Sequence, residues 1–185
     1  MAIRHFLKLA DFTKDELNTM LRRAAEIKAL QKAGTPYAPF GGKVLVMIFE
    51  KASTRTRVSF ESGFYQLGGN VIHLSSQGSQ LGRSESIEDT ARVVSRMCDL
   101  VMIRTFGQDR VEEMAKYSTH PVVNALTDEF HPCQILADFQ TIAEHRGGVD
   151  NLKNQTIAYL GDAANNMANS YLLGGAVAGM NVRVA

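Results

Sequence analysis

Three hydroxyl side chains and two guanidinium groups lie in a row within the stretch FEKASTRTRVSF, residues 49–60. They are the side chains of Ser53, Thr54, Arg55, Thr56 and Arg57, and the apolar run VLVMIF directly precedes the stretch that contains them. The first N–H groups of a helix lack internal partners and carry the positive end of its dipole, so a helix that begins here attracts an anion. Arginine adds a planar fork that fits phosphate oxygens. The cluster therefore predicts an anion site of the phosphate type.

Part of the same cluster also has a purely structural interpretation. Ser53 can cap the helix, and Arg57 can pair with Glu61 one helical turn later. We assign Arg57 to that structural role and Arg55 with Thr56 to the ligand, because a cap needs only one hydroxyl. The Walker pattern GxxxxGK[ST] is absent, and no spacing here supplies a Mg²⁺ site or another metal site.

A second set of chemical groups occurs in HPCQ, residues 131–134. The residue before a proline is driven extended and proline suits the first helical position, so His131 is predicted to cap a helix with Gln134 at its third position. Both side chains could then face one anion, and the positive helix end would lower the pKa of His131 and keep the ring neutral. A histidine that merely caps the helix is an equally good interpretation. Cys133 as a nucleophile is a weaker alternative, since no Asp or Asn that would orient a base is identifiable.

Composition excludes several classes of protein. The 185 residues are 45% hydrophobic and 21% charged with a net charge of +1, which predicts a sizeable core and gives no general attraction to nucleic acid or to an anionic membrane. No window approaches 18 uncharged apolar residues, and the N-terminus MAIRHFLKLADF lacks the apolar region of a signal peptide. Two cysteines are too few for a disulfide framework, so we expect a reducing, cytoplasmic setting.

Apolar runs of strand length alternate with segments of helical periodicity along most of the chain. A capped helix is predicted first, from TKDE at 13–16 until Gly34. The expected strands are 44–49, 71–74, 99–104, 121–126, 156–160 and 181–185. The expected helices between them are about 54–67, 86–97, 109–117, 132–145 and 164–179. This alternation indicates an α/β fold: a parallel sheet of the first four strands flanked by helices, followed by the start of a second, Rossmann-like α/β domain.

The chain is expected to divide at the polar, glycine-rich stretch HRGGVDNLKN, residues 145–154. We place the first domain at 1–147 and the beginning of the second at 148–185. In open parallel sheets, ligands bind beyond the carboxyl ends of the strands. Each polar cluster follows one of the predicted strands, and Arg104 ends the third, which favours a ligand contact over a salt bridge at the rim.

The motifs STRTRVSFE and HPCQ resemble those of the aspartate/ornithine carbamoyltransferase family, and the similarity extends through essentially the whole chain. The loop SSQGSQLGRSES at 75–86, with Gln80 and Arg83, is similar to the ornithine branch rather than the aspartate branch. The segments HFLKLADFTKDEL and GDAANNMANS are similar to that branch as well.

The resemblance implies roles for individual residues. The phosphate of carbamoyl phosphate would be held by Ser53, Thr54, Arg55, Thr56 and Arg104. The carbamoyl group would be held by His131 and Gln134 together with Thr56 and Arg104, so that Thr56, Arg104 and His131 would take part in catalysis. Gln80 would reach the site from a neighbouring subunit, which implies a homo-oligomer built from trimers. Asn166 would contact L-ornithine.

The implied reaction is transfer of the carbamoyl group to the δ-amine of ornithine, which gives citrulline and phosphate without a metal or organic cofactor. The chain ends directly after the strand expected at 181–185, and the Ser-Met-Gly and His-Cys-Leu-Pro segments with which the family binds ornithine do not occur in it. We therefore expect a truncated chain that lacks much of the ornithine site. A different amine acceptor and a non-catalytic phosphate-binding domain remain the alternatives.

Overall fold

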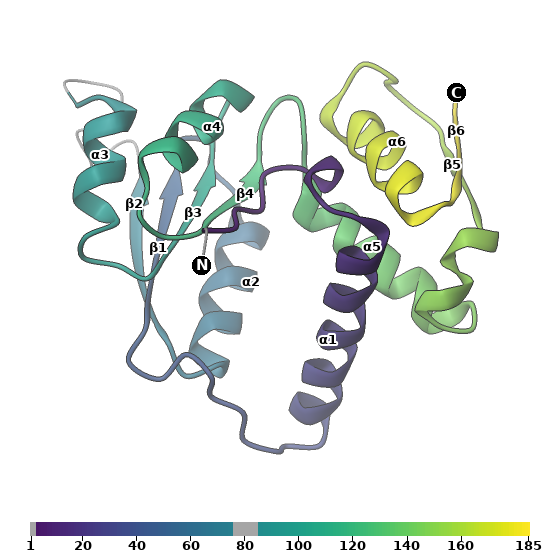
Figure 1. The fold of residues 1–185 in the computed structure, drawn as a ribbon, viewed down its shortest axis with the longest axis horizontal. Helices are drawn as coiled ribbons and strands as arrows, with labels where there is room; N and C mark the ends of the chain where they lie inside the picture. The colour runs from purple at the N-terminus through teal and green to yellow at the C-terminus, as the bar shows by residue number, and fades with distance from the viewer. Residues whose placement is uncertain (1–2, 76–84) are drawn as a thin grey trace. The chain divides into compact units, whose positions relative to one another are not determined.

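The computed structural model describes residues 3–75 and 85–185 and contains a four-stranded parallel sheet (Figure 1). The strands are β1 (Val44–Phe49), β2 (Asn70–Ser75), β3 (Leu100–Arg104) and β4 (Val122–Leu126). Their spatial order is β2-β1-β3-β4, and every neighbouring pair is parallel. The single parallel layer predicted from the sequence is therefore confirmed. Phe49 pairs with both Ser75 and Arg104, so the carboxyl ends of the three strands β1, β2 and β3 lie level at one edge.

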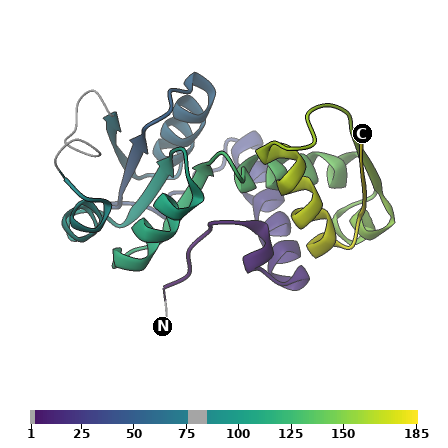
Figure 2. The same ribbon diagram turned by 90° about the horizontal axis from the view of Figure 1, so that it is seen from above.

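Helices cover both faces of this sheet (Figure 2). Val46 and Ile48 of β1 pack in one core with α3 (Ile87–Val94) and α4 (Gln108–Tyr117), and the alternate residues Leu45 and Met47 pack in another core with α2 (Thr54–Gln66). Successive side chains of a strand point to opposite faces, and a sheet that is covered on both faces needs apolar residues at every position. This arrangement explains why VLVMIF is an uninterrupted apolar run.

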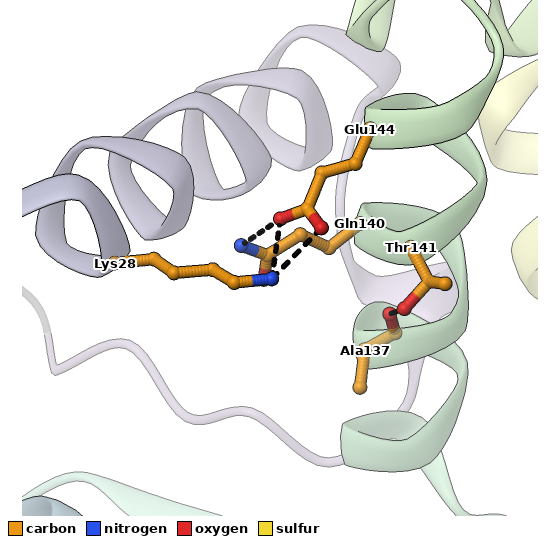
Figure 3. A network of polar contacts seen from close by, with 5 residues as sticks. All are labelled: Lys28, Ala137, Gln140, Thr141 and Glu144. Carbon is orange, nitrogen blue, oxygen red and sulfur yellow. Dashed lines mark hydrogen bonds and ion pairs between the residues drawn. The ribbon is translucent and has the colours of Figure 1, made fainter. Parts of the chain in front are cut away.

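Helix α1 (Lys14–Lys32) packs against α5 (Pro132–His145) in another part of the molecule. The predicted capping box is present: Thr13 N–H donates to the Glu16 carboxylate over 2.8 Å, and Glu16 N–H donates to the Thr13 hydroxyl over 3.3 Å. On the facing surfaces, Lys28 Nζ meets the Glu144 carboxylate at 2.7 and 2.8 Å (Figure 3).

The C-terminal segment forms a parallel β-α-β unit. Strands β5 (Thr156–Tyr159) and β6 (Asn181–Val184) pair in parallel and are joined by α6 (Asn166–Ala178). Two short 3-10 helices, η1 (Leu9–Asp11) and η2 (Val149–Asn154), complete the elements. A Cβ atom at Gly174 would lie 2.6 Å from Leu9 Cδ1, so a larger residue there would require the Leu9 side chain to shift.

The contacts between Cα atoms divide the chain into two compact units. The first unit contains Tyr37–Thr127 and the N-terminal segment up to Leu7, and the second contains Lys8–Pro36 and Asp128–Ala185. The domain boundary expected after residue 147 follows the order of the chain rather than these contacts, and it stays a prediction. Within the described ranges, no helix combines the length and the apolar character needed to cross a bilayer.

Candidate anion-binding site

The start of α2 has the geometry that the sequence predicts. Ser53 is extended, with φ −162° and ψ 115°, and α2 begins at Thr54. Ser53 Oγ accepts a hydrogen bond from Thr56 N–H over 3.3 Å and donates one to Thr56 Oγ1 over 3.0 Å. The capping role of Ser53 is confirmed, and the cap fixes the two hydroxyls at the positive end of the helix.

Arg104, the last residue of β3, joins this helix start from the neighbouring strand. Its Nη1 donates to Thr56 Oγ1 over 3.3 Å. Its Nε is buried and has no hydrogen-bond partner among residues 3–75 and 85–185. A buried donor without an acceptor costs free energy, and native proteins satisfy nearly all such groups. The unmatched N–H is therefore available to an acceptor on a ligand, such as an anion.

The electrostatics of the same place also favour an anion. Burial lowers the pKa of Arg104 below its ordinary value, and the positive charge of Arg55 lowers it further. In the part of the chain that the structure describes, neither arginine forms an ion pair with a carboxylate. An anion bound beside Arg104 would offset both of these effects on its guanidinium. The cluster of Ser53, Arg55, Thr56 and Arg104 is hereafter called the anion cluster.

A cleft of about 470 Å³ opens beside the anion cluster. Its lining residues are Phe49, Glu50, Ala52, Ser53, Thr54, Arg57, His73 and Ser75. They all come from the carboxyl ends of β1 and β2 or from the start of α2. The family resemblance assigns Ser53 and Thr54 to the phosphate, and both line the cleft, whereas Arg55, Thr56 and Arg104 are not among its lining residues. The assignment of these residues to a ligand stays a prediction.

Two basic residues line the cleft although the sequence analysis did not select them for ligand contact. Arg57 does pair with Glu61 at 3.3 Å, as expected, but it also lines the cleft. His73 lies near the end of β2 with its ring centroid 5.1 Å from that of Phe49. Burial, and then the charge of Arg57, lower the pKa of His73. A histidine inside an ordinary strand pattern gives no sign that it will face a cleft, and only the strand order revealed it.

The second unit holds His131 and Gln134 at the beginning of α5. His131 is the N-cap residue, and its N–H donates to Ser170 Oγ over 2.7 Å. Its side chain makes no capping hydrogen bond, so the interpretation in which the ring merely caps the helix is not supported. Gln134 occupies the third helical position, as the sequence predicts.

The Gln134 amide has a defined orientation. Its Nε2 donates to Asp138 Oδ1 over 3.0 Å, and Tyr171 donates its hydroxyl hydrogen to the other carboxylate oxygen of Asp138 over 2.6 Å. Burial and the neighbouring Asp138 raise the pKa of Tyr171, so the phenol stays protonated and keeps this hydrogen bond. An ionised carboxylate only accepts hydrogen bonds, so the amide must turn its nitrogen to Asp138 and its oxygen the other way.

The remaining candidates have different outcomes. Burial raises the pKa of Cys133 to about 12, which opposes the nucleophile hypothesis because the thiolate is the reactive form. Asn166 is the first residue of α6, and the preceding Asn165 caps that helix through Met167 N–H and Ala168 N–H. Gln80 and Arg83 lie outside the described residues. Among those described, no group of three or more His, Cys, Asp or Glu side chains could hold a metal ion.

Comparison with known proteins assigns the family. The sequence profile of a family described as "Aspartate/ornithine carbamoyltransferase, carbamoyl-P binding domain" matches residues 4–144. The chain belongs to the aspartate/ornithine carbamoyltransferase family. The matched range of the carbamoyltransferase domain contains the whole anion cluster together with His131 and Gln134, whereas Asn166 lies beyond it.

Individual relatives give the same assignment. The chain is 64% identical over 183 residues to an ornithine carbamoyltransferase of Bifidobacterium longum subsp. infantis, covering 99% of this chain and 56% of that protein. It is 55% identical over 185 residues to one of Psychrobacter arcticus, covering 100% and 59%. Among solved structures, ornithine carbamoyltransferase from Pyrococcus furiosus has a TM-score of 0.94 at 47% identity, covering 100% and 57%. The chain thus spans somewhat more than half the length of these carbamoyltransferases.

Proposed function

We propose that the complete protein is an ornithine carbamoyltransferase, which transfers the carbamoyl group of carbamoyl phosphate to the δ-amine of L-ornithine and releases L-citrulline and phosphate. The observation that carries this proposal is the buried Nε of Arg104, which no described residue satisfies and which lies beside Arg55 and the hydroxyls of Ser53 and Thr56 at the start of α2. The names of the relatives supply the acceptor, since all of those reported above are ornithine carbamoyltransferases.

In this proposal the first unit binds the phosphate group. Ser53, Thr54, Arg55 and Thr56 donate from the start of α2, and Arg104 donates from the end of β3. Charge-assisted hydrogen bonds contribute roughly 1.5–3 kcal/mol each, so a few of them account for micromolar or tighter binding of a dianion. The anion cluster thereby also stabilises the charge that develops on phosphate as it leaves.

The reacting carbamoyl group is assigned to His131 and Gln134, with Thr56 and Arg104. When the neutral δ-amine attacks the carbamoyl carbon, the carbonyl oxygen becomes an oxyanion, which hydrogen-bond donors in fixed positions stabilise. Removal of one such donor typically costs about 2.7–4 kcal/mol of transition-state stabilisation. The oxygen of the Gln134 amide, which faces away from Asp138, is suited to accept from the carbamoyl NH₂. Asn166 is assigned to ornithine.

The wider context belongs to the same proposal. The protein would act in the cytoplasm in arginine biosynthesis, as a trimer or a multiple of trimers, with Gln80 completing the site of a neighbouring subunit. We propose no metal and no organic cofactor, because phosphate is already a good leaving group and the donors can balance its charge.

The test is citrulline formation by the complete natural protein supplied with carbamoyl phosphate and ornithine. Putrescine and acetylornithine serve as competing acceptors, and a higher kcat/KM for either would replace ornithine in the proposal. Tight binding of carbamoyl phosphate without transfer to any of the three amines would instead support the non-catalytic phosphate-binding domain.

The shared site has a test of its own. Subunits carrying Gln80→Ala and subunits carrying Arg55→Ala are each expected to be nearly inactive. Mixed oligomers should regain part of the activity, because some interfaces then combine two intact halves. Mixtures that stay as inactive as their parents would contradict a site shared between subunits.

A further inference from the structure

Glu50 places a nearly buried carboxylate directly beside the anion cluster. Its side chain is only 8% exposed. Arg110 of α4 holds it with a two-pronged contact, in which Nη2 meets Oε1 at 2.5 Å and Nε meets Oε2 at 2.9 Å. The hydroxyl of Thr105 also donates to the Glu50 carboxylate. Both oxygens of the carboxylate therefore accept hydrogen bonds: Oε1 from Arg110, and Oε2 from Arg110 and Thr105.

The Glu50 side chain and its partners join the ends of β1 and β3, next to the anion cluster. Glu50 directly follows β1, and its N–H donates to the carbonyl oxygen of Arg104 over 2.9 Å. Thr105 directly follows Arg104, so the bond between the Glu50 and Thr105 side chains lies one residue beyond the pairing of Phe49 with Arg104. Ser53 and the start of α2 come three residues after Glu50. The carboxylate thus fixes the spacing between Arg104 and that helix start.

The charge of Glu50 is a disadvantage at this place. A carboxylate beside an anion site repels the anion, and a mobile one could pair with Arg104 or Arg55 and neutralise it. The fork of Arg110 removes both effects, since it compensates the charge and holds both carboxylate oxygens. Neither the sequence motifs nor the family assignment gave Glu50, Thr105 or Arg110 any role.

We propose that Glu50 is a positioning residue for the anion cluster: locked by Arg110 and Thr105, it holds the ends of β1 and β3 so that Arg104 and the start of α2 can bind one phosphate group together. The inference rests on the proposed function for the identity of that anion, carbamoyl phosphate, but its test separates the two.

The test compares carbamoyl phosphate binding by the complete protein and by its Glu50→Gln variant, by calorimetry well below the melting temperature. Glutamine keeps the size of the side chain and removes its charge. If Glu50 acted only through charge, removing a negative group near an anion would leave affinity unchanged or raise it. A positioning role predicts about a tenfold loss, equivalent to one charge-assisted hydrogen bond made poorly.

Arg110→Gln extends the test. It leaves the Glu50 carboxylate charged and free to approach Arg104, so the loss of affinity should exceed that of Glu50→Gln. The double variant should recover part of the loss, because no free carboxylate then remains. Exposed Glu88 with Arg92 on α3 is the matched control pair, and neither Glu88→Gln nor Arg92→Gln should alter binding.

Binding stoichiometry and dissociation constant are measured together so that folding and positioning can be distinguished. A purely structural role would lower the melting temperature or the fraction of competent protein and leave the dissociation constant of that fraction unchanged. Thr105→Val, which keeps the ion pair, provides a milder variant should Glu50→Gln fail to fold, and about a threefold loss is expected. Folded Glu50→Gln or Thr105→Val that binds as tightly as wild type, or tighter, would overturn the inference. No binding of carbamoyl phosphate by the wild-type protein would overturn the proposed function instead.

Discussion

Two side chains of the candidate site, Arg104 in the first unit and Gln134 in the second, differ in how fully the described residues satisfy their polar atoms. Arg104 has a buried donor that finds no partner in the described part of the chain, and the like charge of Arg55 lies close to it. In the second unit, the Gln134 amide is held by Asp138, and Asp138 is held in turn by Tyr171. Hydrogen-bond donors without a protein acceptor, and positive charges without a neighbouring carboxylate, provide binding energy for an anion. Donors and acceptors that are already engaged provide direction, because they fix which atom a side chain presents.

We also predict that the second unit performs no thiolate chemistry at Cys133, although the residue adjoins Gln134, because burial raises the pKa of the thiol. Its pKa of about 12 leaves the thiolate roughly a thousandfold scarcer near pH 8 than for an ordinary cysteine of pKa about 8.5. Iodoacetamide labelling followed by mass spectrometry should therefore be very slow in the native protein and fast after unfolding. Rapid native labelling that carbamoyl phosphate prevents would restore the nucleophile hypothesis.

Replacing Arg104 should have the largest effect on the binding of carbamoyl phosphate. Arg104→Met keeps much of the apolar stem of the side chain and deletes the charge. Loss of two charge-assisted hydrogen bonds costs about 3 kcal/mol or more, so the affinity for carbamoyl phosphate should fall at least about 150-fold. Calorimetry gives the dissociation constant, with Arg92→Met on α3 as the control. A fall of less than about tenfold would mean that Arg104 does not contact the phosphate.

We expect a smaller loss of carbamoyl phosphate affinity when Arg55 is changed so that its charge is kept and only the planar guanidinium group is removed. Arg55→Lys retains the positive charge but cannot make a bidentate contact with phosphate. One lost bond of roughly 1.5–3 kcal/mol corresponds to about a 10- to 150-fold lower affinity. The same titration checks it, and Arg92→Lys is the matched control. Unchanged affinity would show that the first unit binds through charge alone.

The second unit should respond in turnover instead of binding. Asp138→Asn offers Gln134 a donor as well as an acceptor, so the amide is no longer forced to present its oxygen. We expect kcat of the complete protein to fall about tenfold, the effect of about 1.4 kcal/mol, with little change in carbamoyl phosphate affinity. Tyr171→Phe, which leaves the carboxylate in place, should have a smaller effect. Loss of affinity without loss of kcat would reverse the roles that we assign to the two units.

The smallest effect is expected at the exposed pair of Lys28 and Glu144, whose side chains are 43% and 34% exposed. Such pairs are screened by salt and contribute little. Lys28 holds the pKa of Glu144 below its ordinary value, so the stabilisation is present above the unfolded pKa of the carboxyl and is lost as the pH falls through the lower folded value. Lys28→Met should lower the melting temperature slightly at neutral pH, and not at low pH or in 1 M salt. A double-mutant cycle with Glu144→Gln measures the pair, and a large coupling would contradict us.

Local sequence was sufficient to predict the order of the elements and several helix caps. The alternation of apolar strands with amphipathic helices predicted the parallel sheet, and the caps at Thr13, Ser53 and His131 were each placed correctly. These features depend on interactions within a few residues, since caps and helical periodicity act over one or two turns. Helix ends were less exact: the helix expected at 86–97 is α3, Ile87–Val94, and the residues at 95–97 form a turn instead.

The choice between ligand contact and structural contact was only partly accessible from sequence. Arg57 was correctly paired with Glu61, four residues away. Its additional place in the cleft depends on β2, which pairs beside β1, and so does the presence of His73. No local pattern distinguishes a strand histidine that faces a cleft from one that faces the core.

The sequence by itself determined which chemical groups this protein has for an anion. A strand-to-helix junction can be identified from a short local motif, and the carboxyl ends of parallel strands lie at one edge of the sheet. Only the tertiary structure decided which of those groups remain unsatisfied. Glu50, Thr105 and Arg110 lie up to 60 residues apart along the chain, yet they form one locked group. Arg104, a single arginine at the end of a strand, keeps a buried N–H without a partner. Hydrogen bonds and charges act through space over a few ångströms, so the balance between a matched and an unmatched group is fixed only when the strands are packed.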